Sequence, residues 1–268
     1  MSDFQAEVRA RIEANGSNAQ LQTEARALLL SSIDAMYSYN FSWLSRPIIQ
    51  YPQDIIAVQE LIWQTRPDLV IETGIAHGGS IIMTASMLAM LDYCDAVESG
   101  QMLDPQAPAR RVVGVDIDIR ADNRRAIETH PMASRIDMIE GSSISPETIE
   151  RVHAAARGYD RIMVMLDSNH TRDHVLAELE AYAPLTSKGS YCIVFDTVIE
   201  DLPDTLIKDR PWRKGNNPKT AVWEFLKSLG DEDRRAFDGD RLSFEIDKMV
   251  ENKLLITVAP DGFLKRIP

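Results

Sequence analysis

Short apolar runs alternate with amphipathic segments through most of the chain. The runs with strand length are Leu69–Glu72, Arg111–Asp116, Ile136–Glu140, Ile162–Asp167 and Tyr191–Asp196. The segments with helical spacing between them are Ser80–Leu91, Asp122–Thr129, Pro146–Ala156 and Thr171–Tyr182. Strands linked by helices of this size pair in parallel through right-handed crossovers, and helices then cover both faces of the sheet. The pattern predicts an α/β fold with a doubly wound, mostly parallel sheet.

The N-terminal part departs from this alternation. It is rich in Ala, Glu, Gln, Arg and Leu, with apolar residues at helical spacing between Leu21 and Ile33. Pro47 and Pro52 then prevent a continuous helix before helical spacing resumes at Asp54. We therefore expect an N-terminal helical extension over residues 1–45 and one domain over residues 46–268.

The C-terminal part differs as well. Residues 199–217 form a long segment without clear periodicity, as is typical of lids, and Asn217-Pro218 then predicts the start of a helix. The apolar run Lys253–Val258, a turn at Pro260-Asp261-Gly262 and Phe263-Leu264 predict a C-terminal antiparallel hairpin.

Composition narrows the possible partners. The chain has 268 residues, of which 44% are apolar, and its net charge of -12 repels nucleic acid and anionic membranes. Its two cysteines, Cys94 and Cys192, lie in apolar segments and are expected to be buried thiols in a reducing compartment. The first residues lack the features of a secretory signal, and the apolar stretch from Ile81 to Leu91 is too short to span a bilayer. We expect a cytoplasmic protein without nucleic-acid or membrane partners.

A glycine turn, Gly74-Ile75-Ala76-His77-Gly78-Gly79-Ser80, follows the first predicted strand. Glycines let the backbone turn sharply, and the free amides of the next helix can bind a phosphate or a carboxylate. The turn lacks the Gly-x-Gly-x-x-Gly pattern of dinucleotide sites and the lysine of a phosphate-binding P-loop. Both absences favour S-adenosylmethionine (SAM), whose carboxylate needs amides but no pyrophosphate cradle. A purely structural turn is the alternative.

Polar residues at the carboxyl ends of the strands matter most, because parallel sheets bind ligands there. Asp116 is placed to accept a hydrogen bond from a ribose hydroxyl, unless it only caps the next helix. Ser142, after Glu140, is placed to contact the adenine, with an ordinary turn as the alternative. The expected cofactor-binding residues are Glu72, Gly74, His77, Gly78, Ser80, Asp116, Ser142 and Asp167.

The most polar strand end, Asp167-Ser168-Asn169-His170, predicts the reaction centre. Asp167 and Asp196 offer carboxylates to a hard divalent cation, which would make a bound hydroxyl easier to deprotonate. His170 could take the proton as a general base. Two alternatives stay open: a helix cap at Asp167 with a surface histidine at 170, or an iron site made of Asp167, His170 and His174.

From about Phe41 to the C-terminus the chain resembles the cephalosporin hydroxylase family of class I SAM-dependent methyltransferases. The resemblance rests on several motifs in order: residues 47–54, 71–80, 166–171, 194–197 and 216–223. It implies a Rossmann-like methyltransferase fold, a homo-oligomer and SAM as the cofactor. Macrolide-sugar O-methyltransferases, which are related, use Mg²⁺ and a histidine base in an Asp-x-x-His pattern that Asp167 and His170 match. An acidic pair ends the next strand in those relatives, whereas this chain has Phe195-Asp196; Thr197 or water would then complete the metal site.

We therefore expect an O-methyltransferase that acts on a hydroxyl of a sugar or glycosylated small molecule, with His170 and Asp167 as catalytic residues and Asp167 and Asp196 as Mg²⁺ ligands. Residues 199–217, Tyr51 and the N-terminal aromatic residues would cover the substrate, and Trp212 and Arg213 would contact it. A non-catalytic methyltransferase-like subunit that supports a partner enzyme is the alternative.

Overall fold

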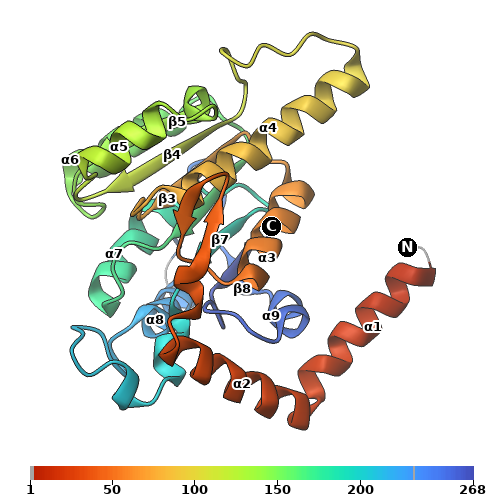
Figure 1. Cartoon of the computed structure of the whole chain (residues 1–268), viewed down its shortest axis with the longest axis vertical. Coiled ribbons are helices and arrows are strands. Elements are labelled where there is room, and N and C mark those ends of the chain that lie inside the picture. The colour runs from red at the N-terminus through yellow and green to blue at the C-terminus, as the bar shows by residue number, and fades with distance from the viewer. Residues whose placement is uncertain (1–2, 232) are drawn as a thin grey trace.

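A seven-stranded sheet forms the centre of the protein (Figure 1). The computed structural model describes residues 3–231 and 233–268. The strands follow the order β5-β4-β3-β6-β7-β9-β8, in which β3 to β7 run parallel and β9 is antiparallel to both of its neighbours. Their bounds are β3 Leu69–Thr73, β4 Arg111–Asp116, β5 Ile136–Glu140, β6 Ile162–Leu166, β7 Tyr191–Val194, β8 Phe244–Ile246 and β9 Phe263–Arg266. This confirms the predicted doubly wound, mostly parallel α/β sheet.

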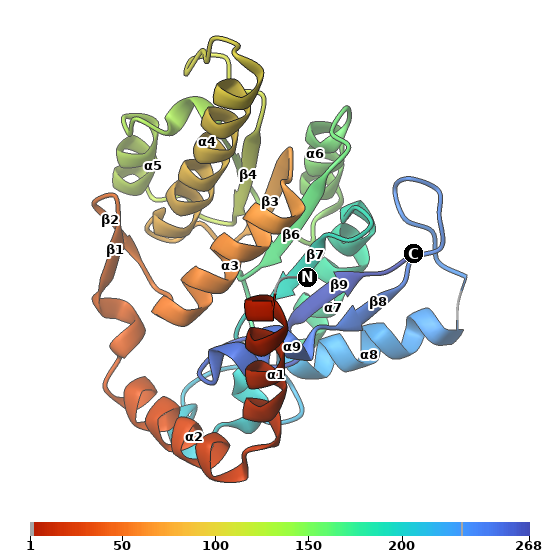
Figure 2. The same ribbon diagram turned by 90° about the vertical axis from the view of Figure 1, so that its right-hand side faces the viewer.

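Helices cover both faces of the sheet, as Figure 2 shows. One face packs against α3 (Pro52–Thr65), α4 (Gly79–Ser99) and α5 (Ala121–Glu128). The other packs against α6 (Pro146–Ala156), α7 (Arg172–Tyr182) and α8 (Pro218–Asp231). Alternate residues of each strand point into the two hydrophobic cores, one on each face of the sheet. Strand β3 lies between these cores with all five of its residues buried. Continuous burial explains why the strands are apolar throughout.

The chain reverses its direction across the sheet at β3. It adds β4 and then β5 on one side and returns to place β6 and β7 on the other. Two strands were predicted too long at their carboxyl ends, because β6 ends at Leu166 and β7 ends at Val194. Asp167 and Asp196 therefore lie in the loops that follow these strands, where their side chains are free to face a ligand at the switch point.

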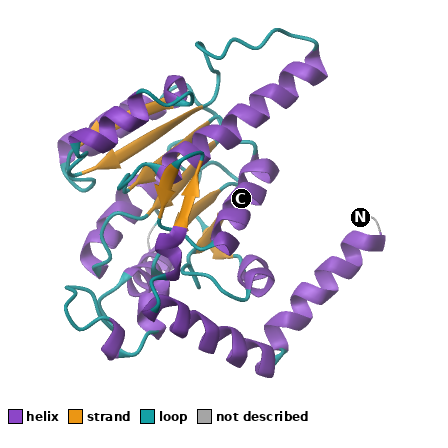
Figure 3. Ribbon diagram, viewed as in Figure 1, coloured by secondary structure: helices purple, strands orange, loops and turns teal. Residues whose placement is uncertain are grey.

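The N-terminal extension is helical, as predicted, but it ends in a hairpin that sequence analysis missed. Helices α1 (Asp3–Ser17) and α2 (Ala19–Asp34) precede a 3₁₀ turn, η1 (Tyr37–Asn40). Strand β1 (Phe41–Trp43) then pairs with β2 (Arg46–Ile48), so the expected boundary between residues 45 and 46 falls at the end of a hairpin turn. Figure 3 shows α1 and α2 extending away from the sheet. Helix α1 also contacts α9 (Lys248–Leu254). Residues 1 and 2 of the expected extension lie outside the described residues.

The C-terminal strands are antiparallel, as predicted, but the first strand of the predicted hairpin was placed wrongly. Residues 253–258 are the end of α9 and the loop after it, and the partner of β9 is β8. Asp247 explains the helix, because its side chain accepts a hydrogen bond from Met249 N (3.0 Å) as an N-cap. The following loop is held by Asp54 of α3, whose carboxylate accepts hydrogen bonds from Thr257 Oγ1 and Val258 N.

Helix α4 is longer than predicted and reaches Ser99. It is long and apolar enough to cross a membrane, yet half of its most apolar window is buried inside the protein, as in the core helix of a soluble protein. Both cysteines are free. Cys192 is buried as expected, whereas Cys94 was predicted wrongly, because it lies toward the C-terminal end of α4 and is only partly buried.

Candidate active site

A cavity of about 410 Å³ opens at the carboxyl edge of the sheet. The glycine turn forms one wall, and the loops after β6 and β7 form the floor. The opposite wall comes from residues 199–212. The N-terminal part contributes Ile33, Ser38 and Tyr39. Segments that are far apart in sequence therefore meet at the switch point of the sheet.

The glycine turn depends on backbone conformations that favour glycine. Gly74 and Gly78 have φ of +93° and +86°. A Cβ at residue 74 would also lie 2.0 Å from the carbonyl oxygen of Asp167. Gly74 thus lets the loop after β6 pass directly against the turn, which brings Asp167 beside the start of α4.

Asp116 holds this turn from the end of the neighbouring strand. Its Oδ2 accepts hydrogen bonds from Ile75 N (2.8 Å) and Ala76 N (3.1 Å), and its Oδ1 accepts one from Asp118 N (3.2 Å). Asp116 does not line the cavity. A carboxylate has further acceptor sites, so the predicted contact with a ribose stays a prediction.

Glu72 lies buried behind the start of α4. Its Oε2 accepts a hydrogen bond from Ser80 Oγ (2.7 Å), while its Oε1 is buried without a hydrogen-bond partner. Burial raises the pKa of Glu72, and the hydroxyl groups of Ser80 and Thr84 oppose this effect. Glu72 does not itself line the cavity, so an ammonium group bound beside Ser80 would interact with this carboxylate through the Ser80 hydroxyl. The methionine part of SAM carries such an ammonium together with a carboxylate, so the site fits this cofactor.

The remaining predicted cofactor residues are divided between the cavity and its surroundings. Gly74, His77, Ser80 and Asp167 line the cavity. Gly78 is the N-cap of α4, and its left-handed backbone conformation leads the turn into the helix. Ser142 is half-buried in the turn after β5 and does not line the cavity, so its contact with adenine stays a prediction.

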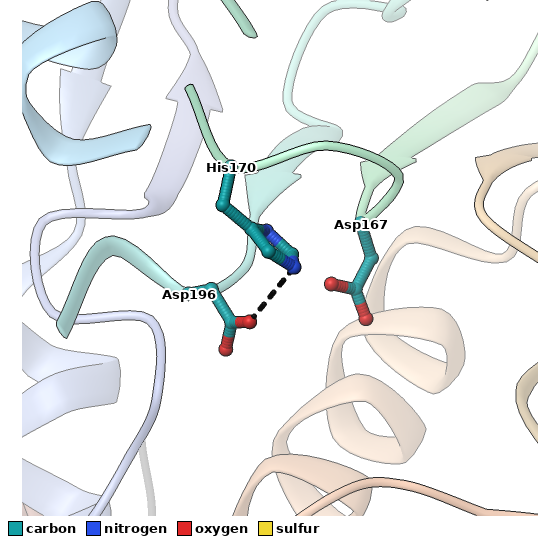
Figure 4. A group of neighbouring side chains, drawn as sticks. All are labelled: Asp167, His170 and Asp196. Carbon is teal, nitrogen blue, oxygen red and sulfur yellow. Dashed lines mark ion pairs between the residues drawn. The ribbon is translucent and has the colours of Figure 1, made fainter. Parts of the chain in front are cut away.

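Asp167, His170 and Asp196 converge on one point of the cavity (Figure 4). One ligand atom from each lies within 4.8 Å of the others, and His170 Nε2 is 3.2 Å from Asp196 Oδ2. Asp196 has a left-handed backbone with φ of +56°, which turns the chain sharply after β7. Sequence analysis thus identified three side chains that the fold brings together from two loops.

The electrostatics of the cluster favour a cation. Burial and the nearby Asp196 raise the pKa of Asp167 well above its ordinary value, and Glu178, Glu72 and Asp54 add to this effect. Several carboxylates in a partly buried site repel one another unless protons or a cation neutralise them. Carboxylate oxygens are the ligands that Mg²⁺ prefers, so Asp167 and Asp196 fit this cation, and the His170 imidazole lies beside them.

The iron-site alternative is contradicted by the position of His174. Its Nε2 lies 3.0 Å from Ser143 Oγ and 3.7 Å from Glu178 Oε1, outside the group of Asp167, His170 and Asp196. His170 lies in the loop before α7, whereas His174 lies in the first turn of α7 and faces Ser143 in the turn after β5. A site with two histidines and one carboxylate is therefore not formed.

The two residues that flank Asp196 add no side-chain ligand. Phe195 is buried in the core. Thr197 is fully buried, and its Oγ1 donates a hydrogen bond to Pro260 O (2.6 Å), so the proposed ligand role of Thr197 is wrong. Water is the alternative that remains.

The segment over residues 199–217 forms a wall of the cavity and includes the end of one 3₁₀ turn, η4 (Thr197–Asp201), and the whole of another, η5 (Asp204–Leu206). Trp212 lines the cavity as predicted, and its ring meets the His170 ring edge to face with centroids 4.7 Å apart. Arg213 does not line the cavity, whereas Arg210 does, so the predicted arginine was wrong. Only the fold shows which of the basic residues in this segment faces inward.

Tyr51 lines the cavity as predicted and joins it to the N-terminal helices. Its hydroxyl lies 2.7 Å from Ser32 Oγ of α2, and its ring contacts Tyr37. Burial raises the pKa of Tyr51, so its hydroxyl stays protonated near neutral pH. Among the N-terminal aromatic residues, Tyr39 also lines the cavity.

The fold is that of the Rossmann-like methyltransferases. A structure described as CmcI with Mg and SAM matches with a TM-score of 0.51 and 16% identity, over 86% of this chain and 78% of that chain. An apo structure of CmcI matches with a TM-score of 0.51 and 16% identity, over 86% and 77% of the two chains. At this identity the likeness concerns the fold.

The sequence assigns the family. The family model described as "Rhamnosyl O-methyltransferase/CmcI" matches residues 35–267. A rhamnosyl O-methyltransferase of Mycobacterium tuberculosis is 30% identical over 214 residues, which are 80% of this chain and 73% of the relative. One from Mycobacterium leprae is 28% identical, over 84% and 82% of the two chains. The chain belongs to the rhamnosyl O-methyltransferase/CmcI family and is a SAM-dependent O-methyltransferase.

Proposed function

We propose that this enzyme transfers the methyl group of SAM to a hydroxyl of a sugar or of a glycosylated small molecule, assisted by Mg²⁺. The observation that carries the proposal is the convergence of Asp167, His170 and Asp196 beside the glycine turn. The relatives named as rhamnosyl O-methyltransferases support a sugar as the acceptor.

Each part of the cavity has one task in this reaction. The glycine turn and Ser80 hold the methionine part of SAM, which supplies the electrophilic methyl group when it is bound. Trp212, Tyr51 and Tyr39 enclose the acceptor on the other side and exclude water. Orienting the two reactants within one enclosed site supplies much of the rate enhancement, because the transfer is then effectively unimolecular.

His170 takes the proton of the acceptor hydroxyl at its Nε2. This atom points between the two carboxylates (Figure 4), and the contact with Trp212 restricts the rotation of the ring. Asp167 and Asp196 would hold Mg²⁺, which lowers the pKa of a hydroxyl that binds to it. Asp196 also faces His170, so a carboxylate is available to stabilise the imidazolium that forms.

The direct test measures S-adenosylhomocysteine production with SAM and a panel of sugar glycosides, with Mg²⁺ or with EDTA. We expect turnover with at least one glycoside, its loss in EDTA and its recovery when Mg²⁺ is added. Asp167→Asn should lower kcat at least about a hundredfold, as expected when electrostatic stabilisation of a reacting oxygen is lost. Asp173→Asn is the matched control, because Asp173 is 82% exposed on the first turn of α7.

Two outcomes would contradict the proposal. Turnover that is unchanged in EDTA would show that the reaction does not need Mg²⁺. Saturable SAM binding without turnover of any glycoside would favour the non-catalytic subunit that supports a partner enzyme.

A further inference from the structure

The segment that covers the cavity carries charge opposite to that of the protein. The chain has a net charge of -12, yet residues 208–214 contain Lys208, Arg210, Arg213 and Lys214 with a single acidic residue, Asp209. Among the described residues, none of these four basic side chains forms an ion pair. A locally positive segment on an acidic protein attracts anions to the place where it lies.

Arg210 brings this charge to the cavity itself. It is the cavity's only lysine or arginine within the described part of the chain. The acidic side chains that line the cavity are those of Asp167 and Asp196. The guanidinium group of Arg210 lies 5.3 Å from the ring centroid of Trp212, and its hydrogen-bond donors are not used by a carboxylate. A guanidinium with free donors binds carboxylates and phosphates through two parallel hydrogen bonds.

Trp212 connects Arg210 with the reaction centre. The same indole ring contacts the guanidinium group of Arg210 and the imidazole ring of His170. An anionic group bound by Arg210 would therefore lie one side chain away from the base. This places the charge on the sugar unit that is methylated or on the unit next to it.

We propose that the acceptor is an anionic glycoside whose carboxylate or phosphate group is bound by Arg210. This inference rests on the proposed function, because it assigns the chemistry of the acceptor for the same site. Lys208, Arg213 and Lys214 strengthen the local positive potential, and Arg210 makes the contact that selects the acceptor.

The test compares three probes that share one sugar ring: methyl glucoside as the neutral probe, methyl glucuronide as the carboxylate and glucose 1-phosphate as the phosphate. Their binding is measured by calorimetry in the presence of S-adenosylhomocysteine and Mg²⁺. We expect one anionic probe to bind about tenfold more tightly than the neutral probe, as for a hydrogen bond to a charged group. The tighter of the two anionic probes identifies the carboxylate or the phosphate as the recognised group.

Arg210→Gln should reduce this preference to less than about threefold, because the amide keeps hydrogen-bond donors but loses the charge. Arg157→Gln is the matched control, because Arg157 is exposed just before β6, at the opposite edge of the sheet. Preference should also fall as salt rises, since the site is partly exposed to solvent.

Equal affinity of the wild-type protein for all three probes would overturn this inference, and so would failure of all three to bind. A preference that Arg210→Gln leaves intact would overturn the role of Arg210. These outcomes are distinguishable from failure of the proposed function, because binding is read without methyl transfer. An anionic preference without turnover would contradict the proposed reaction and leave the assigned anion site standing.

Discussion

The glycine turn and the segment over residues 199–217 form opposite walls of one cavity, but they are held in place by different means. The turn is fixed by backbone geometry: two glycines with positive φ and hydrogen bonds from two of its backbone amides, Ile75 N and Ala76 N, to Asp116. The opposite segment is held by side chains, through bonds from Asn217 and Gly215 N to Glu200 and an ion pair between Lys219 and Asp201. The cofactor side is therefore built for one ligand, whereas the acceptor side can change by substitution of side chains.

The largest effect is expected at His170, in the loop after β6 that forms the floor between the two walls. His170→Ala should lower kcat by about 10²–10⁴-fold, the usual contribution of a general base, and leave SAM affinity within about twofold. Single-turnover kinetics and SAM titration measure the two quantities. His153→Ala is the control, because His153 bonds to Ala181 O away from the cavity. Undiminished turnover in His170→Ala would show that His170 is not the general base.

A pair of glycine substitutions tests the different construction of the walls. Gly74→Ala should destabilise the protein by at least about 3 kcal/mol, because the positive φ costs about 1–2 kcal/mol and the new methyl group overlaps the Asp167 carbonyl. Gly215→Ala should cost only about 1 kcal/mol, because φ is also positive there but no atom lies within 4 Å. Urea unfolding measures both. Equal losses would show that the turn is no more constrained than the opposite segment.

Buried Asp54 makes the stability of the protein sensitive to pH through the loop after α9, which it holds. Burial raises its pKa from 3.8 to about 7, although Thr257 and Val258 donate hydrogen bonds to it. The folded protein then binds more protons than the unfolded chain between pH 4 and 7, so this group's contribution to stability falls as pH rises through that window. We expect Asp54→Asn to reduce the loss of stability between pH 5 and pH 8 by about 2 kcal/mol in urea unfolding. Identical losses for variant and wild type would contradict this assignment.

The smallest expected effect concerns the contact between Trp212 of the segment over residues 199–217 and His170. An edge-to-face pair of aromatic rings contributes about 0.5–1.5 kcal/mol, so Trp212→Leu should lower kcat by about threefold to tenfold. The effect should appear in kcat more than in the KM for SAM, because Trp212 restricts the orientation of His170. A change confined to the KM for SAM would instead place Trp212 on the cofactor side.

The sequence predicted the cofactor side well because its determinants are local. Apolar runs and glycine spacing sufficed to place β3, the turn and α4, since strand burial and positive φ leave direct traces in the chain. The convergence of Asp167, His170 and Asp196 was also predictable, because carboxyl ends of parallel strands lie at one edge.

The acceptor side was less predictable because long-range packing decides it. Nothing local indicates that Arg210 rather than Arg213 faces the cavity. The hairpin of β1 and β2 contains Pro47 and is only three residues long in each strand, so its pattern was too short to recognise. The segment 253–258 has a strand-like composition, but the cap at Asp247 and the bonds to Asp54 make it a helix end and a loop.

Calorimetric titration of SAM measures whether the cavity beside the glycine turn binds this cofactor. We expect saturable binding of one SAM per chain, weakened about tenfold in Glu72→Gln, because that change removes the charged acceptor behind Ser80. Absence of binding by the wild-type protein at millimolar SAM would show that this cavity is not the cofactor site.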